Sequence, residues 1–212
     1  MSTNTSLSFS SRELRDLALA WVALGLAFAI FFAGGGTRAV TNVTEGGLLG
    51  PLLVSLLTAG VGFLLHELAH KVVAVRFGQR AEFRADYGML FLAIMSSLAG
   101  FIFAAPGAVY HRGRITKREH GLIALAGPVT NLLLAAIFLP LLFLGAFGGS
   151  DFLGLVGSRG VAINVFLAAF NMLPFGSLDG KTVFSWSKVV FLVVFVPSVL
   201  VTLGLFVFGG LF

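Results

Sequence analysis

The sequence predicts an all-α polytopic membrane protein with about five transmembrane helices and one re-entrant membrane segment, which could take the form of a β-hairpin. Hydrophobic residues make up 58% of the 212 residues and charged residues only 11%, whereas soluble domains contain about 25% charged residues. Apolar runs of about 20 residues, the length that crosses a bilayer, recur along the chain. Basic residues gather at the ends of these runs.

The apolar runs follow one another with short polar or Gly-rich breaks. They cover residues 17–33, 48–75, 88–109, 122–147, 161–173 and 189–208. A Gly-rich loop, residues 34–47, separates the first two runs. The fifth run is short and ends at Pro174, and Pro197 interrupts the last run, where it marks either a kink or a hairpin.

Basic residues precede the first run, follow the second and third, and precede the last. These residues are Arg12, Arg15, Lys71, Arg76, Arg80, Arg84, Arg112, Arg114, Lys117, Arg118, Lys181 and Lys188. Because cytoplasmic loops are enriched in Lys and Arg, we expect a multi-pass protein of the cell membrane with a cytoplasmic N-terminus. The basic residues suit contacts with anionic membrane lipids. They form no single patch, so no nucleic-acid partner is expected.

The third run, residues 88–109, has basic residues on both flanks, and a full crossing would place one basic cluster outside. The run also contains residues that disfavour one continuous helix, namely Gly88, Ser96, Ser97, Gly100, Pro106 and Gly107. Non-helical backbone at membrane depth is tolerated where it is buried in protein or lines a wet cavity. We therefore expect a re-entrant element beside an active site, with a sixth transmembrane span as the alternative.

The chain divides by composition into a polar cytoplasmic tail, residues 1–16, and a single membrane-embedded domain, residues 17–212. The expected catalytic core is residues 48–181. The chain contains no cysteine, which excludes disulfides and thiolate ligands. Any bound zinc must therefore be held by histidines and carboxylates. No feature of the sequence specifies an oligomeric state.

The segment His66-Glu67-Leu68-Ala69-His70 lies inside the second apolar run. Histidines at i and i+4 face the same way on a helix. This spacing suits two imidazole ligands on one zinc ion, with the intervening glutamate placed to hold a water. Ionisable groups within a membrane are costly, so they indicate a functional site. The alternative is a pair of packing histidines, which would leave Glu67 in need of a buried partner.

A catalytic zinc site usually has a third protein ligand. Most downstream candidates lie among basic residues and resemble solvated interface residues, and Asp151 lies in a Gly-Ser loop: these candidates are Glu82, Asp86, His111, Glu119, His120 and Asp151. Asp179 differs, because it ends an apolar run in which Pro174 and Gly176 break the helix. If residues 88–109 re-enter, Asp179 reaches the membrane half that contains His66 and His70.

Three motifs occur in order along the chain: His66–His70, Ala126-Gly127-Pro128-Val129-Thr130-Asn131, and Asn171…Pro174…Leu178-Asp179-Gly180. Over residues 48–181 the chain resembles the site-2 protease family of intramembrane zinc metalloproteases. The resemblance implies cleavage of peptide bonds in or near the membrane segments of transmembrane protein substrates. It also implies one zinc ion per chain with ligands at His66, His70 and Asp179, and a catalytic glutamate at Glu67.

The resemblance further implies a membrane-associated sheet near residues 88–109, where this chain has a longer and more apolar insert. The chain lacks a PDZ or CBS domain, so regulation by such a domain is not expected. We expect Glu67 to act as general base and Asn171 to donate to the oxyanion, with a helix–helix hydrogen bond as the alternative for Asn171. Asn131 is expected to pin neighbouring helices. The 88–109 element is expected to offer a strand edge to an unwound substrate.

Three other functions are compatible with parts of the sequence. A catalytically silent membrane protein would bind zinc or partner helices without turnover. A different metalloprotease would use Glu82 or Glu119 as the third ligand, although both lie in basic stretches. A transporter would need repeated broken helices in two halves, and the sequence shows no such repeat.

Overall fold

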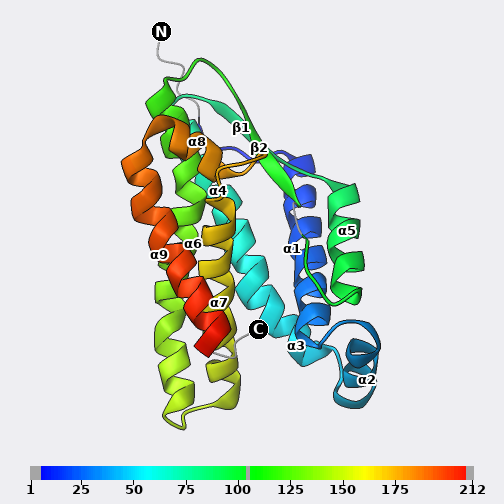
Figure 1. Cartoon of the computed structure of the whole chain (residues 1–212). Helices are drawn as coiled ribbons and strands as arrows, with labels where there is room; N and C mark the ends of the chain where they lie inside the picture. The colour runs from blue at the N-terminus through cyan, green and yellow to red at the C-terminus, as the bar shows by residue number, and fades with distance from the viewer. Residues whose placement is uncertain (1–5, 104–105, 209–212) are drawn as a thin grey trace.

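The fold is a bundle of five long helices with a two-stranded sheet at one end (Figure 1). The computed structural model describes residues 6–103 and 106–208. The long helices are α1 (Ser11–Phe32), α3 to α4 (Leu49–Arg76), α6 (Lys117–Ala146), α7 (Asp151–Asn171) and α9 (Lys188–Phe208). Each is long and apolar enough to cross a membrane. The prediction of an all-α polytopic membrane protein is therefore confirmed.

Two spans are longer than the sequence predicts. Helix α1 begins at Ser11 instead of residue 17, and the Ser10 side chain caps it by accepting from the Glu13 N–H. Helix α7 begins at Asp151 instead of residue 161, with Ser150 as its N-cap. Polar or Gly-rich turns obscured both starts in the hydropathy pattern. The predicted loop 34–47 also contains a helix, α2 (Gly36–Gly46).

The second span contains a short π-helical segment, η1 (Leu56–Gly60), which joins α3 (Leu49–Ser55) to α4 (Val61–Arg76). The Leu56 carbonyl accepts from the Val61 N–H and also from the Trp21 indole N–H of α1, the latter at 3.1 Å. Such π-bulges are frequent at functional sites. Here the bulge lies just before the turn that carries His66.

Two strands lie together at one end of the bundle, with one short helix between them in the sequence (Figure 1). Strand β1 (Arg80–Ala85) pairs antiparallel with β2 (Gly107–Arg112), and the register runs from Arg80↔Arg112 to Ala85↔Gly107. Between them, α5 (Tyr87–Leu98) packs along α1 (Figure 1). Its 12 residues extend only about 18 Å, too short to cross. The prediction of a re-entrant segment with a small sheet is consistent with this arrangement, although α5 separates the two strands, which are called the hairpin below. Among the described residues, no sixth helix is long enough to span a membrane.

Helix α1 holds the outer edge of the hairpin with two buried carboxylates. Glu13 accepts from the Phe83 N–H at 3.0 Å, and Asp16 accepts from the Ala85 N–H at 3.3 Å. Glu13 also forms a 2.5 Å ion pair with Lys71 of α4, and both side chains are 1% exposed. A single carboxylate thus links α1, the hairpin and the helix that carries the histidine motif.

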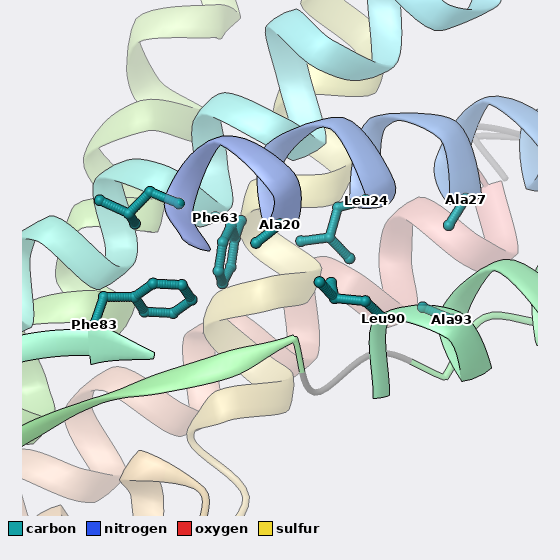
Figure 2. Close-up of a cluster of buried hydrophobic side chains, with 8 residues drawn as sticks. Ala20, Leu24, Ala27, Phe63, Phe83, Leu90 and Ala93 are labelled. Atoms are coloured by element: carbon teal, nitrogen blue, oxygen red, sulfur yellow. The ribbon is translucent and has the colours of Figure 1, made fainter. Parts of the chain in front are cut away.

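A buried apolar cluster fills the space between these elements (Figure 2). The Phe63 ring of α4 meets the Phe83 ring of β1 edge-on, with centroids 5.7 Å apart. The cluster consists of Leu17, Ala20, Leu24 and Ala27 of α1, with Phe63, Phe83, Leu90 and Ala93. This packing presses the hairpin against α4 one turn before His66.

The chain has no cysteine, so single cysteines can test the re-entrant topology. We predict that Arg80→Cys and Arg114→Cys react with a membrane-impermeant maleimide from the same side of sealed vesicles. Phe147→Cys, which lies between α6 and α7, should react from the opposite side. Reaction of Arg80→Cys and Arg114→Cys from opposite sides would mean that the intervening segment crosses the membrane.

Candidate metal centre

His66 and His70 lie one turn apart on α4 and point at the first residue of α8 (Asp179–Trp186). Their Nε2 atoms are 3.0 Å apart, and each lies 3.3 Å from Asp179 Oδ2. Both histidines are buried. The structure therefore gathers three ligand atoms at one point.

The other nitrogen of each imidazole is already hydrogen-bonded. His66 Nδ1 lies 2.6 Å from Asn131 Oδ1, and His70 Nδ1 lies 2.7 Å from the Ile123 carbonyl. Both partners are acceptors, so each Nδ1 carries a hydrogen and each Nε2 presents a lone pair. Asp179 Oδ2 is buried and has no hydrogen-bond partner. Three lone pairs therefore face one another, an arrangement that suits a cation.

Gly127 of α6 leaves the space beside these atoms open. A Cβ at this position would lie 2.5 Å from the Nε2 atoms of both His66 and His70. Glycine therefore lets the bare backbone of α6 border the metal position. Two imidazoles and one carboxylate are a common ligand set of catalytic zinc sites, which leave a further position for water or substrate. The residues present fit a zinc ion.

The turn before α8 brings Asp179 to the histidines. The chain leaves α7 at Asn171, reverses through a short irregular segment and begins α8 at Asp179. Gly180 packs directly against the Met172 carbonyl, so a side chain at this position would collide with the backbone. The Gly that follows Asp179 is thus required by the tightness of the turn.

Glu67 lies beside the three ligands and lines the same cavity. The backbone of Val109 in β2 lies close to the Glu67 carboxylate, and Glu67 Oε2 is buried without a hydrogen-bond partner. Val109 pairs with Phe83, whose own N–H points outward to Glu13. In an antiparallel ladder such a pair directs both N–H groups away from each other. The Val109 N–H is therefore available to position Glu67.

A cavity of about 320 Å³ contains the site. Its lining includes the polar residues His66, Glu67, His70 and Asp179. It also includes apolar side chains from α1, α4, the re-entrant segment and α7, namely Phe28, Phe63, Ile102, Phe166 and Leu167. The cavity therefore joins polar chemistry to an apolar space among the membrane spans.

His111 and His120 also border this cavity. His111 is half-buried, which departs from the prediction of an ordinary solvated residue, whereas His120 is exposed, as expected. Their rings meet edge-on with centroids 5.5 Å apart. Burial lowers the pKa of His111, and the imidazoles of His120 and His70 act in the same direction. All four histidines of the chain thus line one cavity. His111 shares a strand face with Val109 two residues away, a signal visible only once β2 is recognised as a strand.

The remaining acidic candidates are occupied elsewhere. Glu82 contacts Ser10 and Arg84, Asp86 caps α5, Glu119 forms the capping box of α6, and Asp151 lies in the first turn of α7. Among the described residues, the group of His66, His70 and Asp179 is the one set of three such donors close enough to share an ion. The structure places Asp179 where the sequence analysis expects the third ligand.

The two asparagines singled out in the sequence occupy different positions. Asn131 is fully buried, where it contacts His66 and the Gly62 carbonyl, so it joins α6 to α4 and also touches a candidate ligand. Asn171 lines the cavity, and its Nδ2 donates to the Leu167 carbonyl of its own helix at 3.0 Å. The helix–helix hydrogen bond considered for Asn171 is not among its described contacts.

Sequence comparison identifies two relatives whose names describe zinc metalloproteases. A protein of Methanocaldococcus jannaschii named "Putative zinc metalloprotease" is 37% identical over 193 residues, which span 90% of this chain and 93% of the relative. The chain belongs to this zinc metalloprotease family. A Bacillus subtilis protein also named "Putative zinc metalloprotease" is 36% identical over 146 residues, 61% of this chain and 66% of the relative. No family model matches the chain. No solved structure matches it.

Membership of a zinc metalloprotease family agrees with the metal position bordered by Gly127. We predict that Gly127→Ala lowers zinc affinity by about tenfold or more, since overpacking costs about 1–3 kcal/mol. The matched control is Gly204→Ala in α9, where an added Cβ meets nothing within 4 Å. Competition with a chromogenic chelator measures both affinities. Equal affinities for the two variants would show that Gly127 does not border the ion.

Proposed function

We propose that this zinc metalloprotease is an intramembrane endopeptidase of the site-2 protease type. It hydrolyses peptide bonds in or near the transmembrane segments of membrane-protein substrates. The observation that carries the proposal is the position of the buried His66, His70 and Asp179 group, which lies beside Glu67 in a cavity among membrane-spanning helices. The proposal includes its location: the protein lies in the cell membrane, in contact with lipids, and its N-terminus is in the cytoplasm.

The ligands are assigned to His66, His70 and Asp179, with one zinc ion per chain. A zinc ion bound there supplies a Lewis acid that polarises the scissile carbonyl and activates water near neutral pH. Glu67 is the general base, which takes a proton from water and returns it to the leaving amine. Glu67 Oε2 is buried and has no hydrogen-bond partner among the described residues. This arrangement suits a carboxylate that must exchange a proton.

Asn171 is the candidate donor to the oxyanion that develops on the substrate. It lines the cavity at the last residue of α7, eight positions before Asp179. Its Nδ2 uses one hydrogen for the Leu167 carbonyl, and an amide nitrogen carries two. The second hydrogen can therefore stabilise negative charge on the reacting carbonyl oxygen.

A helical substrate must unwind before it can be cleaved, because its carbonyls are hydrogen-bonded within the helix. The free edge of β2 is the proposed partner of the unwound segment. Val109 and Gly107 pair with Phe83 and Ala85, whose N–H groups point outward to α1. In such antiparallel pairs the backbone groups of both residues point away from the other strand. The backbone groups of Gly107, Val109 and, two residues further, His111 therefore point away from β1. Pairing with this edge would lay an extended peptide beside Glu67.

We predict that Glu67→Gln lowers the rate of cleavage by about 10²–10⁴-fold, the usual effect of losing a general base. The amide keeps the size of the side chain, so the variant should retain its zinc. Cleavage is measured by mass spectrometry on a library of single-span membrane segments reconstituted with the protein in liposomes. The matched control is Glu119→Gln, in the capping box of α6. Equal cleavage by Glu67→Gln and wild type would instead identify a different base.

The strand-edge hypothesis is tested at His111, where the backbone and side chain can be changed separately. We predict that His111→Pro lowers kcat/KM about fivefold below His111→Ala, because one net hydrogen bond contributes about 1 kcal/mol. Proline is tolerated on an edge strand whose N–H faces outward. Kinetics on a substrate identified in the liposome screen give the ratio. Equal values for the two variants would exclude a substrate hydrogen bond to this N–H.

A further inference from the structure

A buried hydrogen-bond relay runs from the middle of α7 to a candidate metal ligand. Asn164 Nδ2 donates to the Gly160 carbonyl at 2.9 Å. Asn164 Oδ1 accepts from Asn131 Nδ2 at 2.9 Å, and Asn131 Oδ1 lies 2.6 Å from His66 Nδ1. Both asparagines are 0% exposed. The relay therefore connects α7, α6 and α4 at membrane depth, although Asn164 itself touches no candidate ligand.

The direction of every bond in this relay is determined. The Gly160 carbonyl can only accept, so it faces Asn164 Nδ2 and turns Oδ1 toward Asn131. Asn131 Nδ2 uses its two hydrogens for Asn164 Oδ1 and the Gly62 carbonyl. Asn131 Oδ1 is then left to accept from His66 Nδ1. An inverted Asn131 amide would present a donor to His66 and would leave two acceptors facing its oxygen.

The relay sets which nitrogen of His66 can bind a metal. With a hydrogen on Nδ1, the lone pair of His66 lies on Nε2, 3.3 Å from Asp179 Oδ2. With a donor facing Nδ1, the hydrogen would move to Nε2 and block that position. Partners of this kind fix the tautomer and orientation of metal-ligating histidines, and their loss typically lowers metal affinity 10–100-fold.

We propose that Asn164 is a positioning residue for the metal centre, because it fixes the amide of Asn131 and thereby the tautomer of His66. The proposal rests on the proposed function, since it requires the metal to be bound by His66. It assigns to α7 a role in metal affinity that extends beyond packing.

Gly62, whose carbonyl also accepts from Asn131, gives a second way to disturb the relay without removing a polar atom. A Cβ at Gly62 would lie 2.6 Å from Asn164 Oδ1. The added methyl group would therefore push the Asn164 amide away from Asn131. If Asn164 positions Asn131, then Gly62→Ala should weaken metal binding in the same direction as a change at Asn164.

The test compares zinc affinity in detergent-purified full-length variants by chelator competition. Asn164→Leu keeps the size of the side chain but leaves one Asn131 N–H unpaired, and its zinc affinity should fall about tenfold. Asn164→Asp, when neutral, restores both a donor and an acceptor and should return affinity to within about threefold of wild type. The matched control is Thr58→Val, which removes a buried 2.7 Å hydrogen bond to the Val54 carbonyl outside the relay.

The d–d absorption spectrum of the Co²⁺-substituted protein provides a second readout, because it reports ligand geometry without catalysis. Asn164→Leu and Gly62→Ala should alter this spectrum, and Thr58→Val should leave it unchanged. If Asn164→Leu does not fold, Gly62→Ala decides the question with the same two measurements.

The outcomes separate this inference from the proposed function. A wild type that binds no zinc would overturn the proposed function and this inference with it. A wild type that binds zinc, with Asn164→Leu or Gly62→Ala as tight as Thr58→Val, would overturn the inference only. Weaker binding that Asn164→Asp does not restore would also overturn it, because the effect would then come from packing.

Discussion

Three lone pairs converge inside the helix bundle, and the elements around them are arranged to hold these three atoms together. His66 Nε2, His70 Nε2 and Asp179 Oδ2 lie 3.0–3.3 Å from one another. Polar groups at this depth are costly unless they are paired, and these three atoms can pair through a shared cation. Helix α6 pairs the other polar atoms of the two histidines, because the Ile123 carbonyl and Asn131 accept from their Nδ1 atoms. Gly127 of the same helix leaves the space for the ion.

The other half of the fold brings the hairpin to this centre. Glu13 bonds the backbone of β1 with one oxygen and Lys71 with the other, so α1, the hairpin and α4 are joined one residue after His70. The free edge of β2 is thereby fixed near the site, where Val109 lies close to Glu67. The re-entrant helix α5 covers α1 and completes the apolar cluster beneath the hairpin. Helix α4 carries two of the candidate ligands and the candidate base, and α8 brings the third ligand to them.

Much of this arrangement follows from the sequence, for identifiable reasons. The i, i+4 histidines within an apolar run predict a metal-binding helix, and the basic flanks of residues 88–109 predict a return to the same side. The helix-breaking Pro174 and Gly176 before Asp179 predict a turn that can reach the site. These features depend on local spacing and on charge, which a single chain displays directly.

Other features depend on partners far along the chain. The start of α1 at Ser11 is hidden because Glu13 and Asp16 look solvated, yet both are buried against the backbone of β1. His111 lies among basic residues, and only the pairing of β2 turns it toward the cavity. Asn164 lies in the α7 region, where Gly and Ser weaken the apolar pattern. Hydropathy and spacing do not report such contacts between distant segments.

Zinc content shows directly whether His66, His70 and Asp179 share one metal, because it requires no knowledge of the substrate. The protein is purified gently in detergent, and its metal is measured by mass spectrometry for wild type, Asp179→Ala and Glu82→Ala. We predict about one zinc per chain in wild type and in Glu82→Ala, with a marked loss in Asp179→Ala. A wild type without zinc, or an Asp179→Ala variant that holds zinc as tightly as wild type, would contradict the assignment of these ligands to one metal.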